Sequence, residues 1–282
     1  MHHILILGCG FTGQRVARRF LARGYPVTAT TRTPVRLASL TQLGARVITL
    51  EDLPAHLDPG VLVLHSIPTP EPAQLLEALG AAPARVVYLS TTAVYGSATQ
   101  VDATTPVDPL SERARPRLEA EQRVAAGPWS SLILRPAAIY GPGRGVQESL
   151  PRCAYYSGDN YVSRIHVDDL AAHAEAALLS NLEGAYPVAD EDPCTTREIA
   201  EFCARFLHLP SVPQPGPGTK ARTTSNRRVD GSAIRNALGI TLTYPSYRTG
   251  IPASLVTKPA QRTNWLTDEK PIDTDSSWPQ FD

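Results

Sequence analysis

The sequence predicts an α/β protein built on a doubly wound parallel sheet, with a small C-terminal lobe. Short apolar runs alternate with amphipathic stretches through the first two-thirds of the 282-residue chain. The runs are apolar throughout and do not alternate with polar residues, which is typical of strands covered on both faces. Repeated strand–helix units of this kind form right-handed crossovers within one sheet.

The positions of the elements follow from these patterns. The first helix places Val16, Ala17, Phe20 and Leu21 on one stripe, and it ends at Gly24. The opposite face of that helix carries Arg15, Arg18, Arg19 and Arg23. Strands are expected at residues 3–7, 27–31, 46–50, 61–65, 85–90 and 131–135. Further helices are expected at residues 34–43, 72–79, 112–126, 168–179 and 195–207.

Composition excludes several classes of function. Hydrophobic residues make up 42% of the chain and charged residues 19%, as in ordinary globular proteins. The 27 basic and 27 acidic residues give no net charge, which argues against a nucleic acid or an anionic membrane as partner. The cysteines lie far apart at positions 9, 153, 194 and 203, which favours a reducing compartment and no zinc site. The first apolar run is too short for a signal peptide, so we expect a cytoplasmic protein.

A glycine-rich turn follows the first strand and precedes the first helix. Gly8, Gly10 and Gly13 form the pattern G-x-G-x-x-G, with Phe11 and Thr12 between the last two glycines. The first glycine permits a tight turn, the second lets the backbone approach a diphosphate, and the third allows close packing of helix and strand. The helix N-terminus offers free N–H groups to the anion. The sequence therefore predicts a Rossmann-type dinucleotide site formed by these five residues.

The end of the second strand indicates which dinucleotide binds. An NAD-selective site usually has an acidic residue here, which receives the ribose 2′-hydroxyl. This chain has Thr31 and Arg32, and no carboxylate follows until Glu51. Because a guanidinium suits a 2′-phosphate, we expect NADP, with NAD as the alternative.

Three later segments carry a family resemblance. They are VVYLSTTAVYGS (residues 86–97), LILRPAAIYGPGR (132–144) and SRIHVDDLAAHAEAAL (163–178). Together with the glycine turn, this ordered set resembles the extended short-chain dehydrogenase/reductase family, the NAD-dependent epimerase/dehydratase group, over about residues 3 to 250. The later segment SNRRVDGSAIRNALGITLTYPSYRTG resembles a small, atypical subgroup of the same fold.

The resemblance implies roles for individual residues. Thr91 takes the place of the family's catalytic Ser or Thr, whose hydroxyl binds a substrate alcohol or carbonyl. Pro136 and Ala137 take the place that lines the nicotinamide ribose, and Tyr140 begins a turn toward the substrate. Ser66 and Ser90 complete the expected cofactor contacts. His166 and Asp168 match a segment that is usually a structural junction.

One motif of the family is missing. In relatives, the helix that corresponds to residues 109–124 carries Tyr-x-x-x-Lys just ahead of a glutamate that aligns with Glu121. Counting back places Arg113 at the tyrosine position and Arg117 at the lysine position. No Tyr occurs between Gly96 and Ile139, and the first Lys is Lys220. Arginine has no acceptor and stays protonated, so it cannot take a proton from an alcohol, although it can bind a phosphate or a carboxylate.

Three interpretations stay open at this point. The chain is an oxidoreductase or epimerase that acts on a small carbonyl or sugar-nucleotide substrate, one that can carry phosphate, with another proton donor. Alternatively, it is a non-catalytic NADP-binding sensor, or a structural domain without activity. The candidate proton donors are Tyr95, Tyr140, Tyr155, Tyr156 and Tyr161. The catalytic set that we predict is Thr91 and Tyr140, and no residue pattern indicates a metal site.

The domain organisation follows from the same features. We expect a nucleotide-binding domain over residues 1–182, in which 140–163 insert toward the substrate. A small substrate-side lobe is expected over 183–255, and a polar tail over 256–282. The sequence does not indicate the oligomeric state.

Overall fold

A parallel sheet of seven strands forms the centre of the molecule. The computed structural model describes residues 2–68, 75–108, 112, 114–153, 155, 157–213 and 226–256. The strands lie in the order β11-β7-β5-β4-β1-β2-β3, and every neighbouring pair is parallel. This confirms the predicted fold class. Their bounds are β1 Ile4–Leu7, β2 Val27–Thr30, β3 Arg46–Ile48, β4 Val61–His65, β5 Pro83–Leu89, β7 Ser130–Pro136 and β11 Gly184–Val188.

Both faces of the sheet are buried, as the continuous apolar runs predicted. In β1, Ile4 and Ile6 face one hydrophobic cluster, while Leu5 and Leu7 face another on the opposite side. All four are fully buried. The alternation follows from the two-residue period of a strand, which sends successive side chains to opposite faces.

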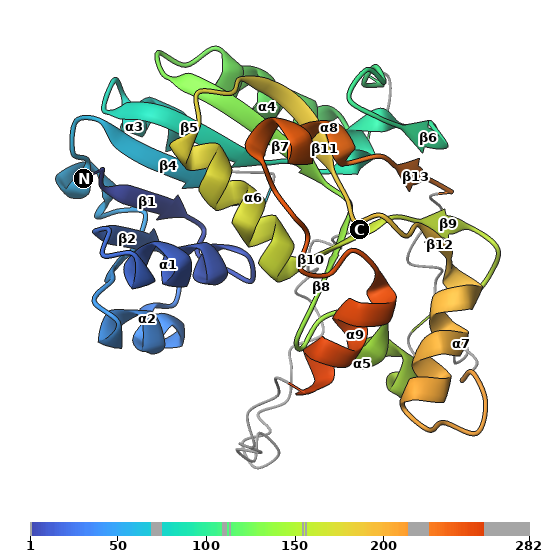
Figure 1. Ribbon diagram of the computed structural model, residues 1–282. Coiled ribbons are helices and arrows are strands. Elements are labelled where there is room, and N and C mark those ends of the chain that lie inside the picture. Colours follow the sequence, from blue (N-terminus) through green and yellow to red (C-terminus); the bar gives the residue numbers. More distant parts are fainter. Residues whose placement is uncertain are drawn as a thin grey trace.

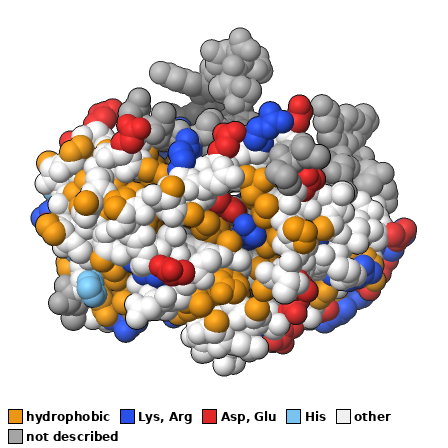
Figure 2. Space-filling view, turned by 90° about the horizontal axis from the view of Figure 1, so that it is seen from above, with side chains coloured by type: hydrophobic (Ala, Val, Ile, Leu, Met, Phe, Trp, Pro, Cys, Tyr) orange, Lys and Arg blue, Asp and Glu red, His pale blue; other side chains and the backbone are white. Residues whose placement is uncertain are grey.

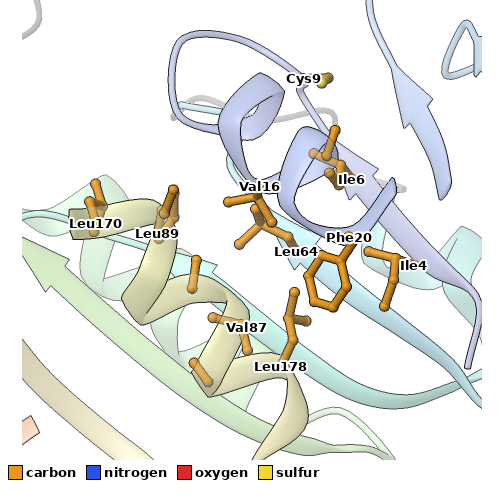
Figure 3. Close-up of a cluster of buried hydrophobic side chains, with 14 of the residues drawn as sticks. Ile4, Ile6, Cys9, Val16, Phe20, Leu64, Val87, Leu89, Leu170 and Leu178 are labelled. Atoms are coloured by element: carbon orange, nitrogen blue, oxygen red, sulfur yellow. The ribbon is translucent and has the colours of Figure 1, made fainter. Parts of the chain in front are cut away.

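Helices cover the two faces (Figure 1). On one face, α1 (Gly13–Ala22) and α6 (Val167–Leu179) pack over the sheet, while α3 (Leu75–Leu79) and α4 (Arg115–Ala125) pack on the other. Figure 3 shows Val16 and Phe20 of α1 and Leu178 of α6 meeting strand side chains such as Leu64 and Val87. This buried area supplies the main hydrophobic stabilisation of the domain.

The arginines of α1 join the two helices on that face. Arg15 Nε donates to Asp168 Oδ1 at 2.8 Å. Further along the chain, Arg19 and Arg23 both pair with Glu175 Oε atoms, at 2.5 and 2.8 Å. The face of α1 opposite its apolar stripe is therefore not simply solvated, because three of its arginines are ion-paired to α6.

The lobe is a second hydrophobic unit. It is built from α5 (Val146–Ser149), α7 (Thr196–Phe206) and α9 (Tyr247–Val256), which share one buried cluster and lie together at the lower right of Figure 1. Short strand pairs connect it to the sheet domain. They are β8 Ala138–Tyr140 with β10 Arg164–His166, β9 Tyr161–Val162 with β12 Cys194–Thr195, and β6 Gln100–Val101 with β13 Arg228–Val229.

Several predicted boundaries differ from the structure. Residues 184–188, which we grouped with the lobe, form β11 of the central sheet, and α8 (Ser232–Leu238) packs against β11 and α6. The helix expected at 34–43 is split into a 3₁₀ helix, Pro34–Leu37, and α2, Ala38–Gln42. The other 3₁₀ helices span Leu53–His56, Thr92–Tyr95 and Leu150–Arg152.

The helix ends have local explanations. The helix expected from residue 112 begins at Arg115, because Pro116 is best placed in a first turn. Thr195, expected inside α7, is its N-cap and forms a capping box with Glu198. Residues 72–74 and 257–282, to which we assigned a helix start and the polar tail, lie outside the described residues.

A buried histidine makes stability depend on pH. His173 in α6 is fully buried, and its Nδ1 lies 2.7 Å from the carbonyl oxygen of Asp169. Burial lowers the pKa of His173 to about 4, below its value in an unfolded chain. The stabilising contribution is therefore fully present above the unfolded pKa, about 6.5, and is lost as the pH falls through 4.

We predict that the advantage of the wild type over His173→Gln in free energy of unfolding shrinks by about 3 kcal/mol between pH 7 and pH 4. Urea unfolding at a series of pH values measures it. The matched control is His2→Gln, at an exposed position. Parallel pH profiles for wild type and His173→Gln would contradict the prediction.

Candidate functional site

The candidate site lies where the strand order reverses. The chain proceeds from β1 to β2 and β3 on one side and returns to β4 and β5 on the other. In such sheets, ligands bind in the crevice at the carboxyl ends of the two strands that flank this point. The glycine turn follows β1 and Ser66 follows β4. The topology thus brings both predicted cofactor segments to one crevice.

The glycine turn is held by neighbouring strands. The Gly8 N–H donates to Thr30 Oγ1 at 3.0 Å, from the end of β2. From the other side, Ser66 Oγ donates to the Gly8 carbonyl at 2.8 Å. Gly8 has a φ of +74°, and a Cβ on it would lie 2.7 Å from Ile67 Cγ1. Only glycine fits there, because both the conformation and the space exclude a side chain.

The turn presents a cradle of N–H groups. Among the residues that the structure describes, the amides of Phe11, Thr12 and Gly13 donate to no protein acceptor. Of the atoms of the described residues, a Cβ on Gly10 would have only the Gly8 oxygen within 4 Å, at 3.8 Å, so these residues leave the space above it open. At Gly13 a Cβ would lie 3.0 Å from Ile6 Cγ2, which accounts for the third glycine. These residues fit the diphosphate of a dinucleotide, since they offer donors, an open approach and a helix N-terminus.

The end of β2 exposes a cation next to this cradle. Arg32 is exposed, and within the described part of the chain no hydrogen bond or ion pair holds its guanidinium. Thr31 Oγ1 accepts the Thr33 N–H at 3.2 Å, which tightens the turn. In Rossmann domains the residue at this point commonly borders the adenosine ribose, which is the basis of the expectation for Arg32.

A buried polar network lies beneath the opposite side of the crevice. Ser90 Oγ donates to Glu121 Oε1 at 2.5 Å. Arg135 binds both oxygens of Glu121, at 3.1 and 2.7 Å, and its Nη1 donates to the Tyr95 hydroxyl at 3.2 Å. Burial raises the pKa of Tyr95. The network joins the end of β5 to α4 and β7. Ser90, which we expected to contact the cofactor, donates its hydroxyl hydrogen to Glu121 within this network.

Thr91 lies at the mouth of the crevice. It follows β5 and caps the 3₁₀ helix Thr92–Tyr95, with its Oγ1 accepting the Ala93 N–H at 3.2 Å. The side chain is half-buried, and no acceptor for its O–H is present among the described residues. A hydroxyl oxygen that accepts one N–H in this way still has its own hydrogen to donate.

Tyr140 lies inside the lobe. Its side chain is 3% exposed, packs in the cluster of α5, α7 and α9, and donates to the Ser246 carbonyl at 3.4 Å. Burial raises its pKa far above the usual range, and Asp190 and Asp169 add to the effect. This position favours a packing role. The catalytic role stays a prediction.

The remaining predicted residues take structural positions. Pro136 ends β7 and is buried against β11. His166 caps α6, with its Nδ1 accepting the Asp168 N–H at 3.2 Å, while the Asp168 carboxylate binds Arg15. This arrangement agrees with the junction role that the resemblance implied for His166 and Asp168.

Comparison with known proteins identifies the family. Residues 71–189 match the NAD dependent epimerase/dehydratase family. A conserved protein of unknown function from Silicibacter pomeroyi DSS has a structure similar to this one, with 30% identity and a TM-score of 0.76, over 91% of this chain and 99% of that one. The chain is a member of the NAD-dependent epimerase/dehydratase family.

Other relatives extend the comparison. Protein YeeZ of Escherichia coli K12 is 28% identical over 270 residues, which cover 87% of this chain and 97% of YeeZ. WbmG of Bordetella bronchiseptica was solved in complex with NAD and UDP. It shares the fold, with a TM-score of 0.72 over 91% of this chain and 94% of WbmG, at 16% identity.

From the sequence we assigned Arg113 and Arg117 to the Tyr-x-x-x-Lys positions of the family, and this assignment stays a prediction. Arg117 lies on α4, half-buried, and its Nη1 donates to the Tyr88 hydroxyl at 3.2 Å. Arg113 lies outside the described residues. Tyr88 is fully buried in β5, so the Arg117 side chain is tied to the core at one end.

Sequence reasoning missed one arginine of the site. The buried guanidinium of Arg227, on the segment that enters β13, donates to the carbonyls of Thr92, Gly96 and Ala98. It therefore holds the segment that follows Thr91. Nothing in the sequence signals this contact, because the partners are backbone atoms about 130 positions away.

Three further observations on this family member bear on function: membrane spans, metal-ligand groups and surface charge. Within the described ranges, no helix is both long and apolar enough to cross a bilayer, and no three His, Cys, Asp or Glu side chains group as metal ligands. Figure 2 shows one face of the molecule, on which acidic and basic side chains are interspersed. That face has no field of one sign that would attract a polyanion.

The buried Glu121–Arg135 pair is expected to be essential for stability. Glu121→Gln removes the charge opposite a guanidinium whose side chain is only 12% exposed. We predict a loss of about 3 kcal/mol in free energy of unfolding, because a buried charge is left uncompensated.

Urea denaturation measures this loss. Glu119→Gln, an exposed position on the same helix, is the matched control and is expected to change stability by less than about 0.5 kcal/mol. Equal effects of the two variants would show that the pair does not stabilise the fold.

Proposed function

We propose that this protein is an NADP-dependent oxidoreductase or epimerase whose active site lacks the Tyr–Lys pair. The observation that carries the proposal is the cradle of N–H groups at Phe11, Thr12 and Gly13, beside the open face of Gly10. It faces the crevice that Ser66 and Thr91 also border. A site for a dinucleotide and a hydroxyl for a substrate oxygen therefore share one edge of the sheet.

The cofactor part of the proposal depends on the cradle and on Arg32. When bound, the nicotinamide ring supplies hydride transfer. The chain's own residues would bind the diphosphate through backbone N–H groups and the 2′-phosphate through the Arg32 guanidinium. Structures with this fold, such as WbmG, bind NAD, so the choice of NADP is our inference from the residue at the end of β2.

The substrate part depends on Thr91 and on the lobe. Thr91 would donate its O–H to a carbonyl or alcohol oxygen and so orient the reacting carbon. The lobe, built from α5, α7 and α9, would cover the substrate. WbmG was solved with UDP, which supports a sugar nucleotide as one substrate class. A small carbonyl compound is the other.

A second candidate is a non-catalytic NADP-binding sensor. Arg117 cannot accept a proton. Tyr95 is a buried phenol and Tyr155 a half-buried one. Desolvation raises the pKa of both, that of Tyr155 to about 12, which makes them weak acids at neutral pH. Tyr161 stays a candidate proton donor and its ring stacks on the Arg228 guanidinium, while Tyr156 lies outside the described residues.

One experiment separates the enzyme from the sensor. Mass spectrometry first identifies a copurified ligand, and absorbance at about 340 nm is then followed while a panel of carbonyl compounds is added, because only hydride transfer at the nicotinamide changes this absorbance.

Arg32 is expected to select the cofactor. We predict that Arg32→Asp raises the Kd for NADP at least about 10-fold, because a charge-assisted bond to the 2′-phosphate is replaced by repulsion. The Kd for NAD should change far less. Calorimetric titration of both cofactors measures the ratio. Arg46→Asp, at the start of β3 and thus at the other end of the strands, is the control. Equal losses for both cofactors would contradict the assignment.

Thr91 and Tyr140 are expected to differ in their effect on turnover. Thr91→Val should lower kcat/KM roughly 10²-fold, because it removes a hydrogen bond to the reacting oxygen, while the Kd for NADP stays the same.

Tyr140→Phe should retain turnover if the phenol only packs. Steady-state kinetics with the substrate found in the panel tests both. Loss of turnover in Tyr140→Phe, with cofactor binding intact, would return Tyr140 to the proton-donor position.

A further inference from the structure

The Arg227 side chain binds the segment that follows Thr91 through all three of its guanidinium nitrogens. Nε donates to the Ala98 carbonyl at 2.9 Å, Nη1 to the Thr92 carbonyl at 2.5 Å, and Nη2 to the Gly96 carbonyl. The residue is only 7% exposed. Within the described ranges no carboxylate pairs with this guanidinium, and burial lowers its pKa. Because burying a cation among neutral partners costs stability, the contact calls for an explanation beyond packing.

The main chain of the same residue is bound on the lobe side. The Arg227 N–H donates to the Tyr161 carbonyl at 2.8 Å, and the Tyr161 N–H donates to Asn226 Oδ1 at 2.9 Å. Tyr161 belongs to β9, which pairs with β12, and β12 leads directly into α7 of the lobe. Arg227 therefore joins the lobe through its backbone and the segment after Thr91 through its side chain.

The direction of the Thr91 side chain depends on that segment. Thr91 Oγ1 accepts the Ala93 N–H at 3.2 Å, and the Thr91 carbonyl accepts the Val94 N–H at 3.5 Å. Both donors lie in the 3₁₀ helix Thr92–Tyr95, and Arg227 binds the first carbonyl of this helix. A shift of the helix would therefore move the hydroxyl of Thr91 with it.

We propose that Arg227 is a positioning residue, which orients the Thr91 hydroxyl toward the substrate and couples it to the lobe. This inference rests on the proposed function, in which Thr91 donates to the reacting oxygen. On its other side the 3₁₀ helix is held to the sheet domain, where Arg135 donates to the Tyr95 hydroxyl. The helix is thus fixed between the two parts of the molecule that would enclose the substrate. A displacement of about 1 Å in such a donor costs about 10²-fold in rate.

A double-mutant cycle tests whether Arg227 acts through Thr91. Arg227→Lys keeps the charge but replaces the planar fork of donors by a single flexible ammonium group. We expect it to lower kcat roughly 10-fold and to leave the Kd for NADP unchanged. In the Thr91→Val background, the same substitution should lower kcat less than about twofold, because the group that Arg227 positions is already gone. A merely structural effect would lower kcat equally in both backgrounds.

Arg85→Lys is the matched control. Arg85 is 3% exposed, and its guanidinium also donates to backbone carbonyls, those of Ala177 and Leu182. It lies near the start of β5 and thus at the opposite edge of the sheet from the crevice. We expect Arg85→Lys to lower the melting temperature and to leave kcat unchanged. If Arg227→Lys does not fold, as judged by circular dichroism, Arg227→Gln takes its place in the cycle.

Hydrogen–deuterium exchange gives a second readout, which does not need turnover. In Arg227→Lys, peptides that cover residues 91–98 should exchange faster than in the wild type, while peptides from α4 should not change. Equal losses of kcat in both backgrounds would overturn the inference, and so would unchanged exchange in residues 91–98. If the wild type turns over no compound in the panel, the proposed function fails, and the exchange rates alone then decide whether Arg227 holds the segment of Thr91.

Discussion

The turn between β1 and α1 is the constraint on which the rest of the site depends. It is tied to β2 through Thr30 and to the segment after β4 through Ser66. Gly8 packs so closely on Ile67 that no other residue fits. Because strands on both sides hold the backbone, the N–H groups of the turn keep their direction without a ligand. A diphosphate would meet donors that need no reorganisation, which is how such sites gain affinity.

Arginine side chains form many of the polar contacts that join separate elements of this molecule. Arg15, Arg19 and Arg23 join α1 to α6, Arg135 holds Glu121, and Arg227 holds the segment after Thr91. The planar fork of arginine suits this work, because it satisfies several carbonyl or carboxylate oxygens at once. Lysine, which is absent before Lys220, could offer only a point charge. Arg117, which we predict to stand at the lysine position of the family motif, also forms a structural contact, with Tyr88, and a guanidinium cannot act as a base.

The crevice is assembled from segments far apart in the chain. The Phe11 ring meets Gly141 and Arg144, so the first motif touches the turn that opens the lobe. Arg227 reaches back from β13 to the segment that carries Thr91. Each contact joins the sheet domain to the lobe at the place where a cofactor and a substrate would meet. A change in the lobe can therefore affect the proposed cofactor site directly.

The sequence by itself determined the central sheet and the phosphate turn, because both depend on local patterns. Apolar runs predict buried strands wherever they occur, and G-x-G-x-x-G needs only its own neighbours to form. The sequence did not reveal β11 as a strand of the sheet, since residues 184–188 include Gly184 and Pro187 and lack a continuous apolar run. Nor did it place Tyr140 in the lobe core, Ser90 on Glu121, or Arg144 on Phe11. Those positions follow from contacts over long sequence separations, where packing and the pairing of buried charges decide which side chain faces which, and only the tertiary structure decides them.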